Sequence, residues 1–371
     1  MSLIIPLLSL FYYFYFSIVG IYIIFMPKVI ADLGYSASEV GTVFAAAPLV
    51  RFLLPFVFMK GLQLSANMFR ASFMLVIFSL LLFYFALDSF YPLLFVNILL
   101  GAGLGLTLPY VENMALHTIG KERYGKVRLF GSLGFIIVAL VLVKFLSSAY
   151  VALDFLLFLS IAMALSAFYL QKIAPQIKEE AQEENPNDVN LLRDWQLWLG
   201  LLLMQTSFGS FYNFFTIYET DRGVTLDMTV YLWSFGVVVE VFMLFFQARF
   251  LRGNLLSVLQ FSIFATVLRW FLVFAYPTEL GILFFAQSLH ALSFALFHSA
   301  TISYLHHHYK NRTLSQQFYS GVGYGLGGLS GALLAGYVYE YYPKYLFLSS
   351  SFIAFGAFVM LTLYKKSVSN P

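Results

Sequence analysis

Long apolar stretches separated by short polar breaks run along nearly the whole chain. A membrane-spanning helix needs roughly 20 mostly apolar residues. Breaks at charges and turn residues predict twelve such helices, near 6–26, 38–58, 70–87, 91–116, 128–147, 151–171, 195–217, 228–248, 255–276, 280–305, 315–338 and 345–364. Connections such as 88–90 are so short that consecutive helices must be antiparallel neighbours. We therefore expect an all-α membrane protein.

One connection differs from the others in length and polarity. From 172 to 194 the chain is rich in Glu, Asn and Pro, which is typical of a solvated linker. It predicts an N-terminal six-helix half at 1–171, a cytoplasmic linker at 172–194 and a C-terminal six-helix half at 195–371. Two such halves around a central site are the arrangement of many secondary transporters.

The basic residues predict which ends of the helices face the cytoplasm. If both termini are cytoplasmic, the outer connections hold only Lys28, Arg222 and Lys344. The inner connections then hold Lys60, Arg70, Lys121, Arg123, Lys126, Lys172, Lys178, Arg193, Arg249, Arg252, Lys310, Arg312, Lys365 and Lys366. This asymmetry predicts cytoplasmic termini in a multi-pass protein.

Composition excludes several classes of protein. The chain is 61% hydrophobic and 11% charged, whereas soluble domains are about 45–50% apolar and about 25% charged. The excess apolar surface must face a lipid bilayer. The net charge of +3 is too small to indicate a nucleic-acid partner, and the absence of cysteine excludes disulfides and thiolate metal sites. The first apolar run is too long for the core of a signal peptide, and it lacks a basic start and a small-residue cleavage site.

Ionisable residues inside the predicted spans are the candidate functional groups, because each costs several kcal/mol unless it is paired or hydrated. These residues are Arg51, Glu112, Arg128, Glu240, Arg269, His290 and His298. Both halves contain acids or bases, so the groups could neutralise one another across the interior.

Glu112 shares a helical face with Gly101 and Gly105. The glycines allow a neighbouring helix to approach closely, and Pro109 permits a bend beside the carboxylate. Two interpretations stay open, a substrate-binding carboxylate or a structural ion pair with Arg128.

Glu240 lies deep in an apolar helix and is our candidate proton carrier. An unpaired carboxylate there would be protonated at neutral pH, whereas a nearby Arg269 would let it ionise. The alternative is a permanent pair between Glu240 and Arg269 that holds two helices together.

Histidine titrates near physiological pH, so His290 and His298 are further candidates. Their spacing of eight residues places them within about 80° of each other on an α-helix. The alternative is a structural histidine satisfied by a hydroxyl. Arg51 either binds substrate or ties two helices together.

Two other patterns have simpler explanations. The glycine run at 321–331 has no preceding strand and no phosphate-binding Lys–Ser/Thr, so it predicts close helix packing. Three adjacent histidines, His306 to His308, cannot all face one ion. We expect no metal site, no catalytic residue and no cofactor.

Several segments together resemble the major facilitator superfamily, in particular its phenylpropionate permease type, which is related to the lactose permease group. The matching segments are PLVRFL around Arg51, YGKVRLFGSLGF at 124–135, YLWSFGVVVEVFMLF at 231–245, VLRWFLVF at 267–274 and QSLHALSFALFH at 287–298. The resemblance implies the major facilitator fold and an inner-membrane proton symporter. By position it assigns substrate binding to Glu112 and Arg128, and proton coupling to Glu240, Arg269 and His290.

Two departures from the lactose permease group affect this assignment. That group has a second carboxylate one turn after its tenth-helix histidine, and Ser293 stands there in this chain. Proton transfer must therefore rest on Glu240, with or without His290, or the coupling differs from that of the lactose permease group. The superfamily signature after the second helix is also degraded at 59–70.

We therefore expect a proton-coupled symporter that imports a small organic solute by alternating access, with an aromatic acid such as a phenylpropionate as the first candidate. The substrate would meet Arg51, Glu112, Arg128, His298 and aromatic walls. Candidates for those walls are Trp233, Phe211 and Tyr212. The alternatives are an oligosaccharide or nucleoside symporter, a proton-coupled exporter and, more remotely, a membrane-embedded enzyme. Oligomeric state stays open, since transporters of two halves can function as monomers.

Overall fold

The computed structural model describes residues 3–59, 65–173 and 189–369. Every regular element within these ranges is helical, and helices cover all twelve predicted spans. Most of the predicted linker and the centre of the degraded signature segment lie outside the described residues. Both predictions therefore stay untested there.

The first half contains seven helices in six spans. They are α1 (Ile4–Ile24) with its short continuation α2 (Met26–Asp32), α3 (Ala37–Met59), α4 (Ala66–Ala86), α5 (Phe90–Ile119), α6 (Lys121–Phe145) and α7 (Ala149–Ile173). Within this half α1 packs against α6 and α7, and α4 packs against α5 and α7.

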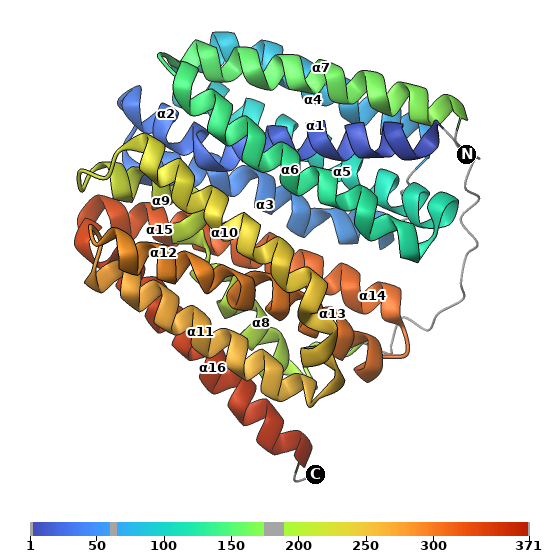
Figure 1. The fold of residues 1–371 in the computed structure, drawn as a ribbon, viewed down its shortest axis with the longest axis vertical. Helices are drawn as coiled ribbons and strands as arrows, with labels where there is room; N and C mark the ends of the chain where they lie inside the picture. Colours follow the sequence, from blue (N-terminus) through green and yellow to red (C-terminus); the bar gives the residue numbers. More distant parts are fainter. Residues whose placement is uncertain (1–2, 60–64, 174–188, 370–371) are drawn as a thin grey trace.

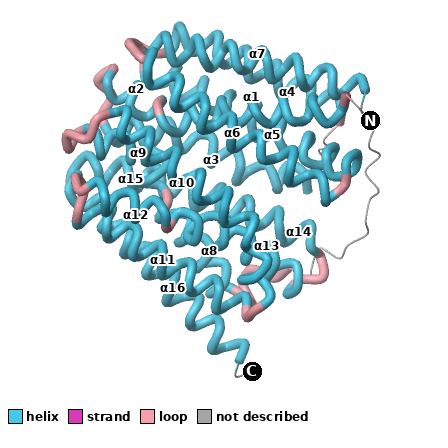
Figure 2. Tube along the Cα trace, viewed as in Figure 1, coloured by secondary structure: helices cyan, strands magenta, loops and turns pink. Residues whose placement is uncertain are grey.

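Three spans of the second half are interrupted or change their winding. Its elements are α8 (Trp195–Ser207), α9 (Gly209–Thr220), α10 (Leu226–Phe246), the 3₁₀ turn η2 (Gln247–Arg252), α11 (Leu255–Ala275), α12 (Leu280–Ser288), the π-helical segment η3 (Ala291–Leu296), α13 (Phe297–His308), α14 (Arg312–Phe318), the π-helical segment η4 (Tyr319–Gly327), α15 (Gly328–Tyr341), the 3₁₀ turn η5 (Pro343–Tyr345) and α16 (Leu346–Ser369). The seventh span is thus α8–α9, the tenth is α12–η3–α13 and the eleventh is α14–η4–α15 (Figure 2).

Ten segments in the described part of the chain are long and apolar enough to cross a membrane by themselves. The two predicted spans outside this set are 195–217 and 315–338. Both are helical, but glycine, serine, threonine, glutamine and asparagine dilute their apolar content. The same two spans supply polar and glycine residues to the central cavity described below. Their low hydropathy therefore reflects a cavity-facing position, and the prediction of twelve helices agrees with the structure.

Polar caps explain where several helices begin. The side chains of Ser65, Thr225, Asn254 and Asn311 each accept a hydrogen bond from the backbone three residues later. Such caps satisfy backbone donors that the first helical turn leaves free. Each helix therefore starts at the polar residue of a connection, close to where the apolar pattern predicted.

The two halves converge at one end of the bundle and diverge at the other (Figure 1). We call the end at which α7 ends and α8 begins the linker end, and the opposite end the far end. Helix α3 packs against η4 and α15, α6 packs against α10, and α2 packs against α9. Two polar ties between the halves in the described part of the chain lie at the far end. They are Glu340, which accepts a bond from the Ser38 backbone N–H at 2.8 Å, and the ion pair Lys144–Asp227. The far end is therefore closed.

Glycines allow the closest helix contacts, as the sequence predicted. A Cβ atom at Gly325 would meet the Phe52 backbone at 2.6 Å, and one at Gly331 would meet the Thr206 carbonyl at 2.6 Å. Alternate glycines of the run therefore face α3 of the first half and the seventh span of the second half. The interpretation of this run as a packing surface is confirmed.

Asp194 anchors the start of α8 at the linker end. This nearly buried carboxylate accepts a hydrogen bond from the Tyr309 hydroxyl at 2.6 Å and lies 3.2 Å from His308 Nε2 and from an Arg193 guanidinium nitrogen. Burial alone would raise the pKa of Asp194, but these hydrogen bonds hold the pKa below its ordinary value. His308 therefore serves helix packing here.

We expect Gly209→Ala to destabilise the protein by about 1–3 kcal/mol, the usual cost of overpacking a tight contact. A Cβ atom at Gly209 would lie 2.1 Å from the Gly331 backbone, which cannot move aside easily. Thermal unfolding in detergent measures the effect. The control is Gly281→Ala, where a Cβ atom meets nothing within 4 Å. Equal stability of the two variants would contradict the predicted contact.

We expect Asp194→Asn to lower thermal stability at neutral pH, by about 1–3 kcal/mol for a charged hydrogen-bonded group. Because the folded-state pKa of Asp194 lies below its unfolded value, its contribution is present at neutral pH and is lost as pH falls through the folded value. The difference between variant and wild type should therefore shrink on acidification. A difference that is constant from neutral pH to below the usual aspartate pKa would contradict this assignment.

Candidate functional site

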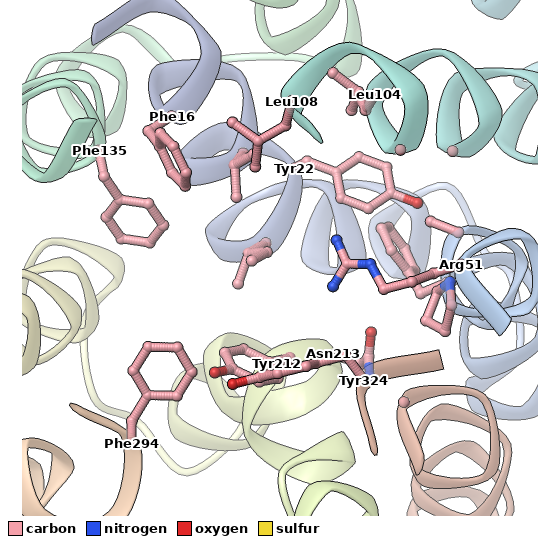
Figure 3. Close-up of a pocket in the computed structure, with 18 of the residues that line it drawn as sticks. Phe16, Tyr22, Arg51, Leu104, Leu108, Phe135, Tyr212, Asn213, Phe294 and Tyr324 are labelled. Atoms are coloured by element: carbon pink, nitrogen blue, oxygen red, sulfur yellow. The ribbon is translucent and has the colours of Figure 1, made fainter. Parts of the chain in front are cut away.

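A cavity of about 380 Å³ lies between the two halves, near the middle of the bundle. Helices α1, α3, α5 and α6 form its first side, and the seventh, eighth, tenth and eleventh spans form the other. Figure 3 shows side chains of both halves facing each other across this space. A central cavity between two halves is where secondary transporters bind substrate.

The walls of the cavity are largely aromatic. Phe16, Tyr22 and Phe135 face it from the first half, and Tyr212, Phe294 and Tyr324 face it from the second (Figure 3). Aromatic rings offer large flat contact surfaces, and the tyrosine hydroxyls add polar points to them. The cavity therefore suits a small solute with an apolar, planar part.

Arg51 is the charged group of α3 that enters this space. Its guanidinium projects into the cavity, and its side chain is solvent-exposed (Figure 3). No acidic side chain of the described residues lies within ion-pair distance of it. Such a guanidinium is free to bind a carboxylate through two parallel hydrogen bonds.

Glu112 and Arg128 form the predicted pair of the first half, with 3.9 Å between a carboxylate oxygen and Arg128 Nε. Their side chains are 35% and 33% exposed, so the pair is hydrated. The Tyr124 hydroxyl donates to Glu112 at 3.2 Å, and the Arg128 guanidinium lies over the Phe16 ring at 3.7 Å. Arg128 lines the cavity, whereas Glu112 lies outside the cavity lining. Glu112 and Arg128 therefore form an ion pair, and Arg128 is the member of the pair that lines the cavity.

In the second half His290 lies between Glu240 and Arg269. The Glu240 carboxylate is 3.3 Å from His290 Nε2, and His290 Nδ1 is 2.8 Å from an Arg269 guanidinium nitrogen. The direct pair between Glu240 and Arg269, which was the alternative interpretation of these residues, is therefore not formed in this conformation. Glu240 and His290 line the cavity, and Arg269 lies behind them, fully buried.

The buried guanidinium of Arg269 is held by neutral partners. It donates to Gln287 at 2.8 Å and to Ser293 at 3.2 Å, and it lies over the rings of Phe211 and Trp270. Ser293 is the residue that replaces the second carboxylate of the lactose permease group. Sequence reasoning missed Gln287, although its position one turn before His290 places it on the same helical face.

These contacts fix the hydrogen of the His290 ring. A guanidinium can only donate hydrogen bonds, so Nδ1 of His290 must accept one from Arg269. The ring is then neutral, and its hydrogen sits on Nε2, the ring nitrogen that lies 3.3 Å from the Glu240 carboxylate. A second ring proton would have to bind Nδ1, where it would meet the N–H groups of the positively charged guanidinium. This arrangement leaves the Glu240 carboxylate as the protonatable member of the group.

The remaining candidates have different positions. Trp233 lines the cavity and donates its indole N–H to Thr216 at 3.1 Å. Phe211 is buried behind Trp233, with 4.0 Å between the ring centres. His298 lies outside the cavity lining, and its Nδ1 is 2.8 Å from the Tyr324 hydroxyl. The π-helical turns of η3 separate His298 from His290, so the two rings serve different contacts.

Comparison with known families decides the assignment. Residues 5–349 match the model of the MFS_1 like family. The chain belongs to this family of major facilitator superfamily transporters. It is therefore a multi-pass membrane transporter, and the alternative of a membrane-embedded enzyme is excluded.

Two known transporters are similar in sequence to much of this chain. A protein of Escherichia coli (strain K12) described as a probable 3-phenylpropionic acid transporter is 27% identical over 90% of this chain and 91% of its own length. The uncharacterized transporter YwbF of Bacillus subtilis (strain 168) is 24% identical over 70% of this chain and 66% of its own length. These matches support the resemblance to the phenylpropionate permease type.

Solved structures show the same fold at low sequence identity. The crystal structure of the nucleoside transporter NupG superimposes with a TM-score of 0.80 and 16% identity over 98% of this chain and 99% of that chain. The peptide transporter PepTSo superimposes with a TM-score of 0.79 and 11% identity over 98% of each chain. At such identities the likeness establishes the fold alone, which confirms the predicted major facilitator architecture.

We expect nitrogen NMR of this transporter, labelled with ¹⁵N-histidine, to show His290 as a neutral ring with its hydrogen on Nε2 at neutral pH. The chain has six histidines, so the signal is assigned by comparison with His290→Asn. In Arg269→Met the donor to Nδ1 is lost, and the ring should populate both tautomers. A doubly protonated His290 in the wild type would contradict the hydrogen-bond assignment.

Proposed function

We propose that this transporter is a proton-coupled symporter that imports a small aromatic carboxylate by alternating access and carries the proton on Glu240. The observation that carries the proposal is the composition of one cavity. It combines aromatic walls, the guanidinium of Arg51 and a carboxyl group backed by a buried imidazole and guanidinium.

The substrate class follows from complementarity. Arg51 would bind the carboxylate, Arg128 would add positive potential, and the aromatic walls would enclose the ring of the substrate. The curated relative described as a probable 3-phenylpropionic acid transporter supports the same class. Trp233 and the Glu112–Arg128 pair would shape the cavity, and His298 would act through Tyr324.

Charge balance provides a reason for coupling. The site holds the guanidinium groups of Arg51, Arg128 and Arg269 and the carboxylates of Glu112 and Glu240, which leaves one positive charge in excess. A substrate carboxylate removes that excess, and a proton on Glu240 restores it. A proton without substrate would instead add a positive charge beside buried Arg269, which is unfavourable in a medium of low dielectric constant. Substrate and proton should therefore bind together.

The sidedness of the protein follows from its basic residues. They predict that the linker end is cytoplasmic and that both termini face the cytoplasm of a cell whose inner membrane holds the protein. The closed far end would then face outward, and the structure would represent an inward-facing conformation. The halves at 1–171 and 195–371 would rock about the cavity as a monomer, with 172–194 as their linker.

Export and other substrates are the alternatives that the test must separate. The same titrating groups could drive proton-coupled export. The likeness in fold to a nucleoside transporter carries no information on substrate at 16% identity. An oligosaccharide would use the hydrogen-bonding groups of the cavity and would not require Arg51.

We expect 3-phenylpropionate to cause protein-dependent acidification inside liposomes that contain a trapped pH dye, whereas the uncharged 3-phenylpropanamide should not. Removing the guanidinium in Arg51→Gln should raise the KM for the acid at least about tenfold, since loss of a charged pair costs about 2–5 kcal/mol. The control is Arg249→Gln, which changes an exposed arginine outside the cavity. Acidification only with a nucleoside or oligosaccharide would contradict the proposed substrate class.

We expect Glu240→Gln to abolish uphill uptake of substrate while it retains exchange of labelled for unlabelled substrate. The amide keeps the hydrogen bond with His290 Nε2–H but cannot gain or lose a proton in the cycle. Counterflow in proteoliposomes measures exchange, and an imposed proton gradient measures uphill uptake. Uphill accumulation by this variant would assign the proton to another group.

A further inference from the structure

Glu219 is a buried carboxyl group that the proposed cycle does not use. It lies in α9, it is 0% exposed, and neither of its side-chain oxygens has a hydrogen-bond partner among the described residues. An apolar side chain would fill this space without the cost of burying a charge or an unpaired polar group. The position therefore indicates a function.

Arg222, the nearest basic residue in the sequence, does not form an ion pair with Glu219. Arg222 donates to the carbonyl oxygens of Tyr218 at 3.0 Å and Pro343 at 3.1 Å, and its guanidinium lies over the Tyr218 ring at 3.4 Å. Arg222 is thus held by two backbone carbonyls and an aromatic ring, and it lies outside ion-pair distance of Glu219.

Charged groups on the elements around α9 have partners of their own. On α2 Lys28 pairs with Asp32, and on α10 Asp227 pairs with Lys144. On α3 Glu39 accepts a bond from the Ser36 N–H, and on α15 Glu340 accepts one from the Ser38 N–H.

Directly after α9, Asp221 accepts a bond from the Tyr339 hydroxyl of α15. In the described part of the chain no basic side chain lies within ion-pair distance of Glu219. An ionised carboxylate would be highly unfavourable there, so the group must carry a proton in this conformation.

Glu219 lies between the cavity and the closed far end. Spacings of three and seven residues place it on the same helical face as Thr216 and Tyr212, and Tyr212 lines the cavity. Seven residues of α-helix place it about 10 Å beyond Tyr212, toward the far end. Helix α9 also packs against α1, α2 and α3 of the first half. Opening of the far end must separate these helices and admit water to this region.

We propose that Glu219 is a second proton-binding site, which exchanges its proton with the far side when the far end opens and closes. In the open form a hydrated Glu219 is ionised at neutral pH. On closure its carboxylate takes a proton from a hydronium ion of the far side and leaves water. On opening, the carboxylic acid returns that proton to far-side water. This proton is thus separate from the one carried on Glu240.

The proposal rests on alternating access, which is part of the proposed function, but it does not depend on the substrate or on Glu240. Because the closed form holds a proton that the open form releases, acidification must favour the closed far end. For one proton the ratio of closed to open molecules changes by at most about tenfold per pH unit.

The test measures the width of the far end as a function of pH without substrate. The chain has no cysteine, so Leu33→Cys and Tyr276→Cys introduce two unique spin-label sites at exposed far-end connections of the two halves. The parent protein carries Glu240→Gln, which removes the titration of Glu240. Pulsed electron paramagnetic resonance then gives the fractions of closed and open molecules at each pH.

We expect the closed fraction of the parent to rise on acidification and this pH dependence to disappear when Glu219→Gln is added. The matched control is Glu279→Gln, which neutralises an exposed far-end carboxylate and should leave the pH dependence unchanged. An unchanged pH dependence in the Glu219→Gln protein would overturn the proposal. So would a parent whose closed fraction does not respond to pH.

A second measurement needs no change at Glu219 and covers the case in which that variant does not fold. A Glu112→Gln, Glu240→Gln protein lacks the two other carboxyl groups of the site, and it keeps Glu219 as the acidic side chain that is buried without a partner in the described part of the chain. Infrared spectroscopy at neutral pH should still detect the carbonyl stretch of a protonated carboxylic acid. Absence of that band would show that Glu219 is ionised and would overturn the proposal.

Discussion

Burial of the Arg269 guanidinium imposes conditions on every helix around it. A fully buried charge is tolerated only when hydrogen bonds and a counter-charge replace its hydration. Gln287 and Ser293 supply neutral acceptors, and the rings of Phe211 and Trp270 lie against the guanidinium faces. The nearest counter-charge is reached only through His290. The ninth, eighth and tenth spans are therefore held in one relative arrangement by a single cation.

The two halves solve the problem of intramembrane charge in different ways. In the first half Glu112 and Arg128 are about one-third exposed, so water screens the pair and the side chains can rearrange. In the second half the guanidinium is dry and its neighbours are fixed. A hydrated pair suits contact with substrate, whereas a dry network suits control of a proton position, because interactions are stronger where water is excluded.

Much of the fold followed from hydropathy, and part of the site did not. Apolar length predicted the position of each helix, because lipid contact imposes that length on the sequence. The grouping of Glu240, His290 and Arg269 was predicted, but their order was not, since it depends on helix rotation and on the π-helical turns after His290. Tyr324 was hidden inside a glycine run that predicts packing. The burial of Glu219 could not be predicted, because the polar residues Thr220, Asp221 and Arg222 follow it, as in an exposed connection.

The serine at position 293 explains why the imidazole stands between the two charges. A carboxylate at this position would contact Arg269 directly and would leave the histidine free to accept a proton. Ser293 can only accept a neutral hydrogen bond from the guanidinium, so the counter-charge must come from the eighth span. Glu240 lines the cavity and Arg269 is buried behind the lining, and His290 lies between the two and contacts both. In the proposed cycle, this neutral side chain would thus confine the transported proton to the Glu240 carboxyl group, which faces the cavity and the substrate.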